Sequence, residues 1–145
     1  MSFRETSAWI TLISITLCFG VYYGALLTGL VSIRTWGPLH LGIGCIVALV
    51  ALQAGLNLAV AIRNPKEART PRDERERLID ARSHTIGYYV MMVGMAVALV
   101  FTHLPIHGGE VRGIIIDTVN FGIGVMVVAA LTVAIAQIVM FRRGA

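Results

Sequence analysis

Charged residues are scarce in this sequence: Asp, Glu, Lys and Arg make up 14% of its 145 residues. A soluble globular domain carries roughly 25% of such residues. Hydrophobic residues make up 57%, so a soluble fold would have too little polar surface to cover its core. The scarcity of charge therefore argues against a water-soluble domain and predicts that the lipid bilayer surrounds the protein. The length suits a single compact unit.

Cysteine and catalytic motifs are sparse as well. Cys18 and Cys45 both lie within apolar runs, and the sequence contains no C-x-x-C pair, so both thiols are expected to pack as small hydrophobic side chains. There is no G-x-S-x-G, no H-E-x-x-H, no P-loop and no G-x-G-x-x-G in a strand–helix context. These absences predict that the protein is not an enzyme.

The hydrophobic residues lie in four long runs, each exceeding the ~20 residues that an α-helix needs to cross a bilayer. Short polar turns separate the runs. We therefore predict an all-α membrane protein, a single transmembrane domain over residues 1–145 that forms a four-helix bundle. The predicted helices cover residues 8–33, 38–62, 71–104 and 113–141.

The stretch 63–82 holds seven of the twelve Lys and Arg residues and five of the eight Asp and Glu residues. It is predicted to be a polar hinge between two hydrophobic halves. Thr70 is a suitable N-cap and Pro71 a suitable first helical residue. The third helix is therefore expected to begin about three turns before the membrane and to extend into water.

The positive charges also predict orientation. Ten of the twelve lie near the N-terminus, in the hinge or near the C-terminus, and Arg34 and Arg112 occupy the two other turns. Because Lys and Arg are retained on the cytoplasmic side, both termini and the hinge are predicted to be cytoplasmic. The net charge of +4 then reflects basic residues beside anionic lipid, and nucleic acid is not an expected partner.

The charged start of the third helix is the leading candidate for function, because a rigid charged helix leaving the membrane can be recognised by another molecule. We predict a non-enzymatic accessory or regulatory subunit of a larger membrane complex, which docks its partner through segment 66–84. The predicted docking residues are Arg72, Asp73, Glu74, Arg75, Glu76, Arg77, Asp80 and His84.

Residues 73–90 read D-E-R-E-R-L-I-D-A-R-S-H-T-I-G-Y-Y-V. This segment resembles the start of the third helix in an uncharacterised family of small bacterial four-helix inner-membrane proteins. In that family a D-E-R-D/E run precedes an apolar pair, a basic residue and a Tyr-Tyr-Val helix start. This chain departs from the pattern at residues 81–84, which read Ala-Arg-Ser-His. The resemblance implies a bacterial cytoplasmic (inner) membrane location and no particular activity.

Polar residues inside the apolar runs give an alternative function. Gln53 and Asn57 lie one turn apart in the second helix, and Asp117 and Asn120 lie one turn apart in the fourth. Polar residues in a membrane span are costly, and they often mark a path for ions or solutes. The alternative is thus an oligomeric ion or small-solute channel or transporter. The competing interpretation is hydrogen bonding between helices.

Histidines near the outer turns give a third alternative. His40, His103 and His107 are expected at the same membrane face. Imidazole groups on facing helices can bind haem or a divalent metal. Their spacing matches no known metal motif, however, and the main prediction includes no cofactor.

Small residues recur at helical spacing in the first two helices, including Gly20 and Gly24 in one, and Gly44 and Gly55 in the other. In lipid, such stripes allow helix backbones to approach closely. We expect these stripes to close the bundle. The alternative is a homo-oligomer that meets through the same four glycines.

Overall fold

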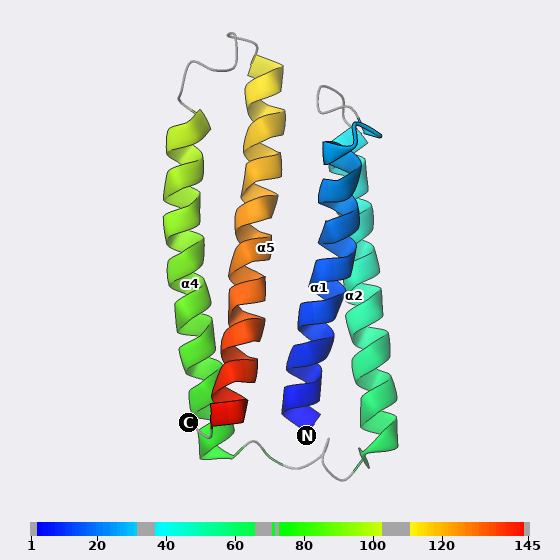
Figure 1. Cartoon of the computed structure of the whole chain (residues 1–145), viewed down its shortest axis with the longest axis vertical. Helices are drawn as coiled ribbons and strands as arrows, with labels where there is room; N and C mark the ends of the chain where they lie inside the picture. Colours follow the sequence, from blue (N-terminus) through cyan, green and yellow to red (C-terminus); the bar gives the residue numbers. More distant parts are fainter. Residues whose placement is uncertain (1–2, 32–36, 66–70, 72, 103–110, 144–145) are drawn as a thin grey trace.

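The computed structural model describes residues 3–31, 37–65, 71, 73–102 and 111–143, except for the side chains of residues 3, 102 and 111–117. This part of the chain contains four long helices and no strand (Figure 1). They are α1 (Phe3–Leu27), α2 (Gly37–Arg63), α4 (Glu74–Thr102) and α5 (Val111–Arg143). The predicted all-α fold with four helices is confirmed.

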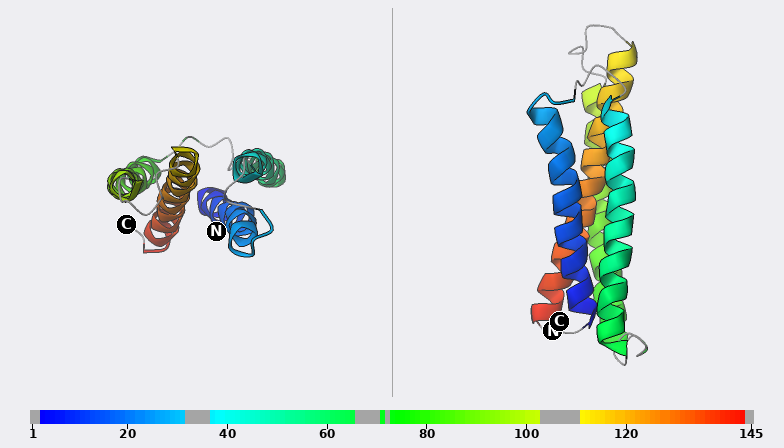
Figure 2. Two further views of the ribbon diagram at one scale, coloured as in Figure 1. Left: turned by 90° about the horizontal axis from the view of Figure 1, so that it is seen from above. Right: turned by 90° about the vertical axis from the view of Figure 1, so that its right-hand side faces the viewer.

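The helices follow the order α4, α5, α1, α2 across the molecule, so the first and last helices of the chain lie at its centre (Figures 1 and 2). α2 packs mainly on α1 and α4 packs mainly on α5, and α1 and α5 join the two helical hairpins. Both termini lie at the end where α2 leads into α4. We call this the hinge end; it carries Arg4, Arg63, Glu74 and Arg143.

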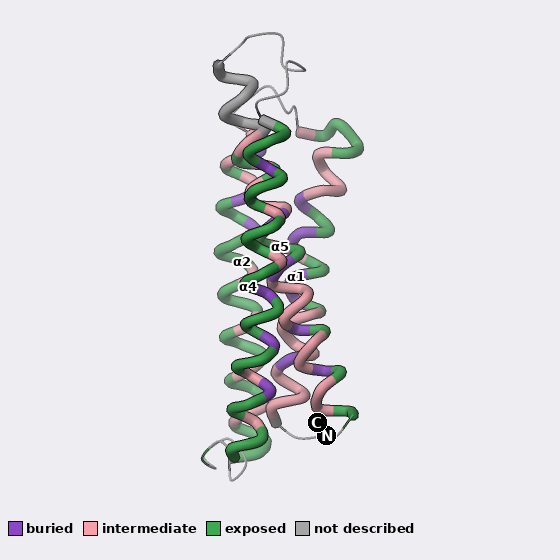
Figure 3. The backbone as a smooth tube through the Cα atoms, turned by 90° about the vertical axis from the view of Figure 1, so that its left-hand side faces the viewer, coloured by how far each residue is buried: buried purple, intermediate pink, exposed green. Residues whose placement is uncertain are grey.

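All four helices are long and apolar enough to cross a membrane, with candidate spans of 24 to 28 residues. Their outward surfaces are dominated by large hydrophobic side chains, including Leu17, Val47, Val93 and Val128. Buried residues follow narrow strips where helices face one another (Figure 3). This distribution is compatible with a multi-pass membrane protein, because lipid covers apolar side chains that water would not.

Helix α1 is shifted towards the N-terminus relative to the predicted range 8–33. It ends at Leu27 because Gly29 adopts a left-handed conformation with φ of 72°, which most other residues avoid. At its other end α1 includes Arg4 and Glu5, whose side chains form ion pairs with Glu76 and Arg142. Hydrophobicity alone could reveal neither the turn at Gly29 nor these ion pairs.

Helix α4 begins at Glu74, later than the predicted start at residue 71. Asp73 is the cap: its Oδ1 accepts a hydrogen bond of 2.8 Å from the Glu74 N–H, and its carbonyl oxygen accepts the Arg77 N–H at 3.0 Å. Thr70, the predicted cap, lies outside the described residues. The 29 residues of α4 span about 44 Å, still well above the roughly 30 Å of a hydrocarbon core.

The contact between α4 and α5 depends on small residues of α4. A Cβ atom added at Gly87 would lie 2.2 Å from Cγ2 of Val133, and one added at Gly94 would lie 2.6 Å from Cγ1 of Val125. Ser83 and Ala98 extend this buried strip in both directions. The two backbones can therefore approach closely, as is common in helix pairs that lack a hydrophobic driving force in lipid.

The glycines predicted to close the bundle do not do so. Cβ atoms added at Gly20, Gly24, Gly44 and Gly55 would meet nothing within 4 Å. The small residues do recur at helical spacing, but these four glycines do not lie on the helix faces that meet another helix. The homo-oligomer through these four glycines stays a prediction, since their surfaces are left open.

Gly87→Ala should therefore destabilise the protein, whereas Gly55→Ala should not. The added methyl group at residue 87 collides with Val133, and overpacking of this kind costs about 1–3 kcal/mol. Thermal unfolding in detergent, followed by circular dichroism, measures the difference. Equal melting temperatures for the two variants would contradict the close approach of α4 and α5.

Candidate functional site

The predicted docking residues of α4 divide between an inward and an outward group. Glu76 faces the protein, and its Oε2 lies 3.6 Å from Nε of Arg4 in α1. Asp80 is also partly buried, whereas Asp73, Glu74, Arg75, Arg77 and His84 are exposed. Arg72 lies outside the described residues. The structure therefore directs Glu76 and Asp80 towards the protein and leaves side chains of both signs, Asp73 and Glu74 with Arg75 and Arg77, outside.

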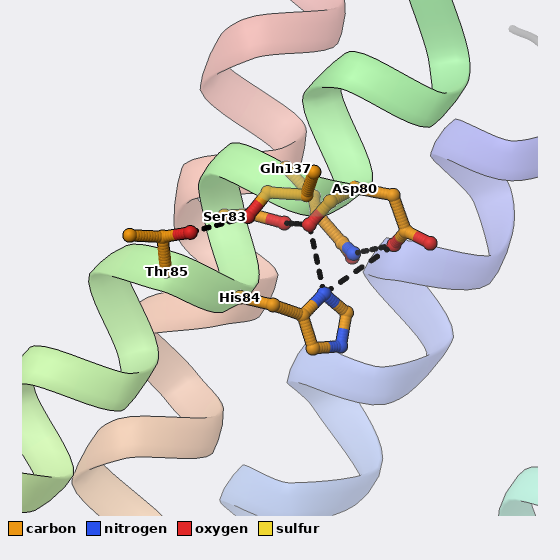
Figure 4. A network of polar contacts seen from close by, with 6 residues as sticks. Asp80, Ser83, His84, Thr85 and Gln137 are labelled. Atoms are coloured by element: carbon orange, nitrogen blue, oxygen red, sulfur yellow. Dashed lines mark hydrogen bonds and ion pairs between the residues drawn. The ribbon is translucent and has the colours of Figure 1, made fainter.

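Asp80 is the centre of a polar network between α4 and α5 (Figure 4). Its Oδ1 accepts a hydrogen bond of 3.0 Å from Nε2 of Gln137, and Ser83 Oγ donates to its carbonyl oxygen at 2.9 Å. Sequence reasoning did not single out Gln137. The available signal was its position near the end of the fourth apolar run, which an antiparallel packing places at the same level as the start of α4.

Asp80 also contacts the imidazole of His84. Its Nδ1 lies 2.8 Å from the carbonyl oxygen of Asp80 and 3.5 Å from Oδ1 of Asp80. A carbonyl oxygen can only accept, so Nδ1 carries a proton and donates. The histidine side chain is 65% exposed, so the rest of the imidazole faces outward.

Arg142 joins the end of α5 to the start of α1. Its Nε lies 3.5 Å from Oε1 of Glu5, and its guanidinium carbon lies 5.4 Å from the centroid of the Trp9 ring. Cation–π contacts of this kind contribute about 0.5–2 kcal/mol. Together with the Arg4–Glu76 pair, this contact ties the first helix to both helices of the second hairpin at the hinge end.

Two separate strips of exposed side chains run along α4, one on each side of the strip that packs on α5. Residues seven apart on a helix lie nearly in line, because seven residues make about two turns. Arg77, His84 and Met91 form one such line, with Tyr88 and Met95 beside it, and all five are exposed. We call these five residues the histidine face.

The second side starts from Arg75, Arg82 and Tyr89, which also lie in line. Leu78 and Val93 flank them, and all five residues are exposed. We call them the arginine face. Arg77 and Arg82 are five residues apart, or about 140° around the helix. The two faces therefore lie on opposite sides of the strip that packs on α5.

The polar residues proposed for an ion path do not meet at one place. Asn57 accepts a hydrogen bond of 2.8 Å from Ser7 Oγ of α1 and donates to the carbonyl oxygen of Gln53. Asn120 instead accepts from Tyr22 and Tyr23 of α1, at the other end of the helices. The side chain of Asp117 lies outside the described residues.

The tyrosine pair of α1 forms a second polar site, which sequence reasoning missed. Tyr22 is fully buried, and its hydroxyl donates to Oδ1 of Asn120, while the Tyr23 hydroxyl donates to the Asn120 carbonyl oxygen at 3.2 Å. Tyr22 lies against Gly42 of α2, and Tyr23 lies against Gly124 of α5. The adjacent tyrosines in a glycine-rich apolar run were the available signal.

The histidines proposed for haem or metal are only partly described. His40 lies in the first turn of α2 and is exposed, whereas His103 and His107 lie outside the described residues. Within the described ranges, no group of three His, Cys, Asp or Glu side chains is placed to hold a metal ion. The metal or haem hypothesis therefore stays a prediction.

Comparison with known proteins finds no matching protein-family model, no similar curated protein and no similar solved structure.

Tyr22→Phe should destabilise the protein by about 1–2 kcal/mol, because it removes the hydroxyl and leaves Oδ1 of Asn120 without that donor in a buried site. Tyr89→Phe is the matched control, since Tyr89 is 64% exposed and should tolerate the change. Unfolding free energies of Tyr22→Phe, Asn120→Ala and the double variant measure the coupling. Additive effects would show that the two side chains do not interact.

Proposed function

We propose that this protein is a non-enzymatic accessory or regulatory subunit, which docks another membrane protein along the histidine face of α4. The observation that carries the proposal is the continuity of this face. It runs from Arg77 at the hinge end, through His84 and Tyr88, to Met91 and Met95 within the apolar part of the helix, and α5 leaves it uncovered.

The chemistry of the histidine face suits a protein partner. Methionine side chains are flexible and polarisable, and they adapt to varied protein surfaces. Tyrosine offers a large apolar ring together with a hydroxyl, a combination that is enriched at protein interfaces. Arg77 adds a positive charge at the polar end, so the expected partner carries an acidic group at that level.

The Asp80 network supports the same proposal. Because Nδ1 of His84 donates to the Asp80 carbonyl, the outward Nε2 of a neutral imidazole is an acceptor. Asp80 is in turn fixed by Gln137 of α5. The imidazole is thus held in one orientation before a partner arrives, which lowers the entropy lost on binding.

Transport is less well supported. Ser7 bonds to Asn57, and Tyr22 and Tyr23 bond to Asn120, which is the pattern of polar residues that hold helices together. An ion path would require these bonds to be exchanged for bonds to the transported species.

Co-purification from native membranes tests the docking proposal. His84→Leu/Tyr88→Leu should lower recovery of the partner at least tenfold, because it removes the oriented imidazole and the phenol. Arg82→Gln/Tyr89→Leu changes the arginine face in a comparable way and should recover the partner normally. If both variants retain the same proteins in the same amounts as the wild type, docking on the histidine face is wrong.

We further propose that the hinge end faces the cytoplasm of a bacterial cell and that the helices cross the cytoplasmic membrane. The excess of Lys and Arg at this end supports the orientation, and the resemblance of residues 73–90 supports the location.

Fluorescent and alkaline phosphatase reporters test the orientation. A green fluorescent reporter fused after Ala145 should be bright, and alkaline phosphatase at the same position should be inactive, because each enzyme or fluorophore matures on only one side of the membrane. Active phosphatase at the C-terminus would reverse the proposed orientation.

A further inference from the structure

The arginine face is a second exposed surface of α4, distinct from the proposed docking face. Its residues change character along the helix. Arg75 and Arg82 lie near the polar start, Tyr89 follows two turns later and is 64% exposed, and Val93, also 64% exposed, continues into the apolar part. Charge, phenol and aliphatic side chains thus follow one another along a single line.

Arg82 has no acidic neighbour on its own helix. Its i±3 and i±4 neighbours are Leu78, Ile79, Thr85 and Ile86, and it forms no ion pair with any residue in the described part of the chain. The nearby acids point elsewhere, since Glu76 pairs with Arg4 and Asp80 accepts from Gln137. The positive charge of Arg82 is therefore available to an outside anion.

The depth of Arg82 favours a lipid as the source of that anion. Tyr89 lies about 10 Å further along the axis, where an exposed tyrosine marks the membrane–water boundary. The aliphatic surface that begins beyond it must contact acyl chains. An arginine one or two turns towards the water from such a tyrosine lies at the level of the phosphates, and its long side chain can extend to reach them.

We propose that the arginine face binds the headgroup of an anionic phospholipid. The Arg82 guanidinium donates two parallel hydrogen bonds to the phosphate oxygens, the Tyr89 hydroxyl lies at glycerol depth, and the acyl chains cover Val93. The positive charge of Arg75, one further heptad into the water, adds attraction for a headgroup with net negative charge. This selects anionic over zwitterionic lipid.

Lipid retention by the purified full chain tests this site. The protein is reconstituted in nanodiscs of phosphatidylcholine with a minor share of phosphatidylglycerol, and native mass spectrometry counts the lipids that remain bound after mild release. Wild type should retain phosphatidylglycerol preferentially. Arg82→Gln should reduce that retention about tenfold, because it removes the paired charge-assisted hydrogen bonds to the phosphate.

Two further variants separate a defined site from general attraction. Arg63→Gln removes one exposed positive charge at the same end of the molecule, outside both faces of α4, and should retain phosphatidylglycerol like the wild type. Arg82→Lys keeps the charge but loses the paired hydrogen bonds, so its retention should fall between those of wild type and Arg82→Gln. Circular dichroism of each variant verifies the fold.

The remaining outcomes overturn the proposal. Equal losses in Arg63→Gln and Arg82→Gln would show diffuse attraction without a site, and no loss in Arg82→Gln would show that this arginine does not bind lipid. Displacement of the retained lipid by inorganic phosphate would assign the site to a free anion. A photo-crosslinker at residue 86, which is exposed and one turn from Arg82, should label lipid in native membranes. Labelling of a protein there would make this face a protein interface.

The lipid proposal does not rest on the docking proposal. The nanodisc measurement contains no partner protein, and the co-purification experiment compares changes on opposite sides of α4. Either proposal can therefore fail while the other stands.

Discussion

The close approach of α4 and α5 at Gly87 and Gly94 determines how the rest of the molecule is presented. Because a side chain at these positions would collide with Val133 and Val125 of α5, the face of α4 that carries the two glycines is the face that packs on α5. This orientation of α4 buries Ser83, directs Asp80 towards Gln137 and leaves the histidine face and the arginine face on opposite sides. A rotation of about a third of a turn would place Arg75 and Arg82 against α5 and would expose Glu76 and Asp80.

This packing decides which charged side chains at the hinge end pair with a neighbouring helix and which stay exposed. The sequence mixes acidic and basic residues along 72–82, and read alone it suggests a surface of both signs. In the structure, Glu5 and Glu76 pair with arginines of neighbouring helices. Pairs at the protein surface contribute roughly 0–1 kcal/mol each. Their main effect is to hold Glu5 and Glu76 against neighbouring helices, while Asp73 and Glu74 stay exposed beside Arg75, Arg77 and Arg82.

The sequence was sufficient for the number of helices and their approximate positions, because long apolar runs determine both. It was insufficient for the helix ends that depend on single residues, such as Gly29 and Asp73. It also could not identify the packing glycines. Gly44 and Gly94 both have apolar surroundings in the sequence, and tertiary contacts decide which helix face meets a neighbour. Gln137, the partner of Asp80, and Asn120, the partner of the tyrosine pair, could not be identified from the sequence because they also depend on tertiary contacts.

The central position of the first and last helices has a consequence for biosynthesis. The Glu5–Arg142 contact joins residues 137 positions apart in the sequence, so the contact surface of α1 for α5 is open until α5 has been synthesised. Until then the first hairpin exists without α5, and its polar side chains Tyr22 and Tyr23 lack their partner Asn120. The contact of α1 with α5 is therefore among the last that the growing chain can form, and a factor that shields α1 during that interval would favour correct folding.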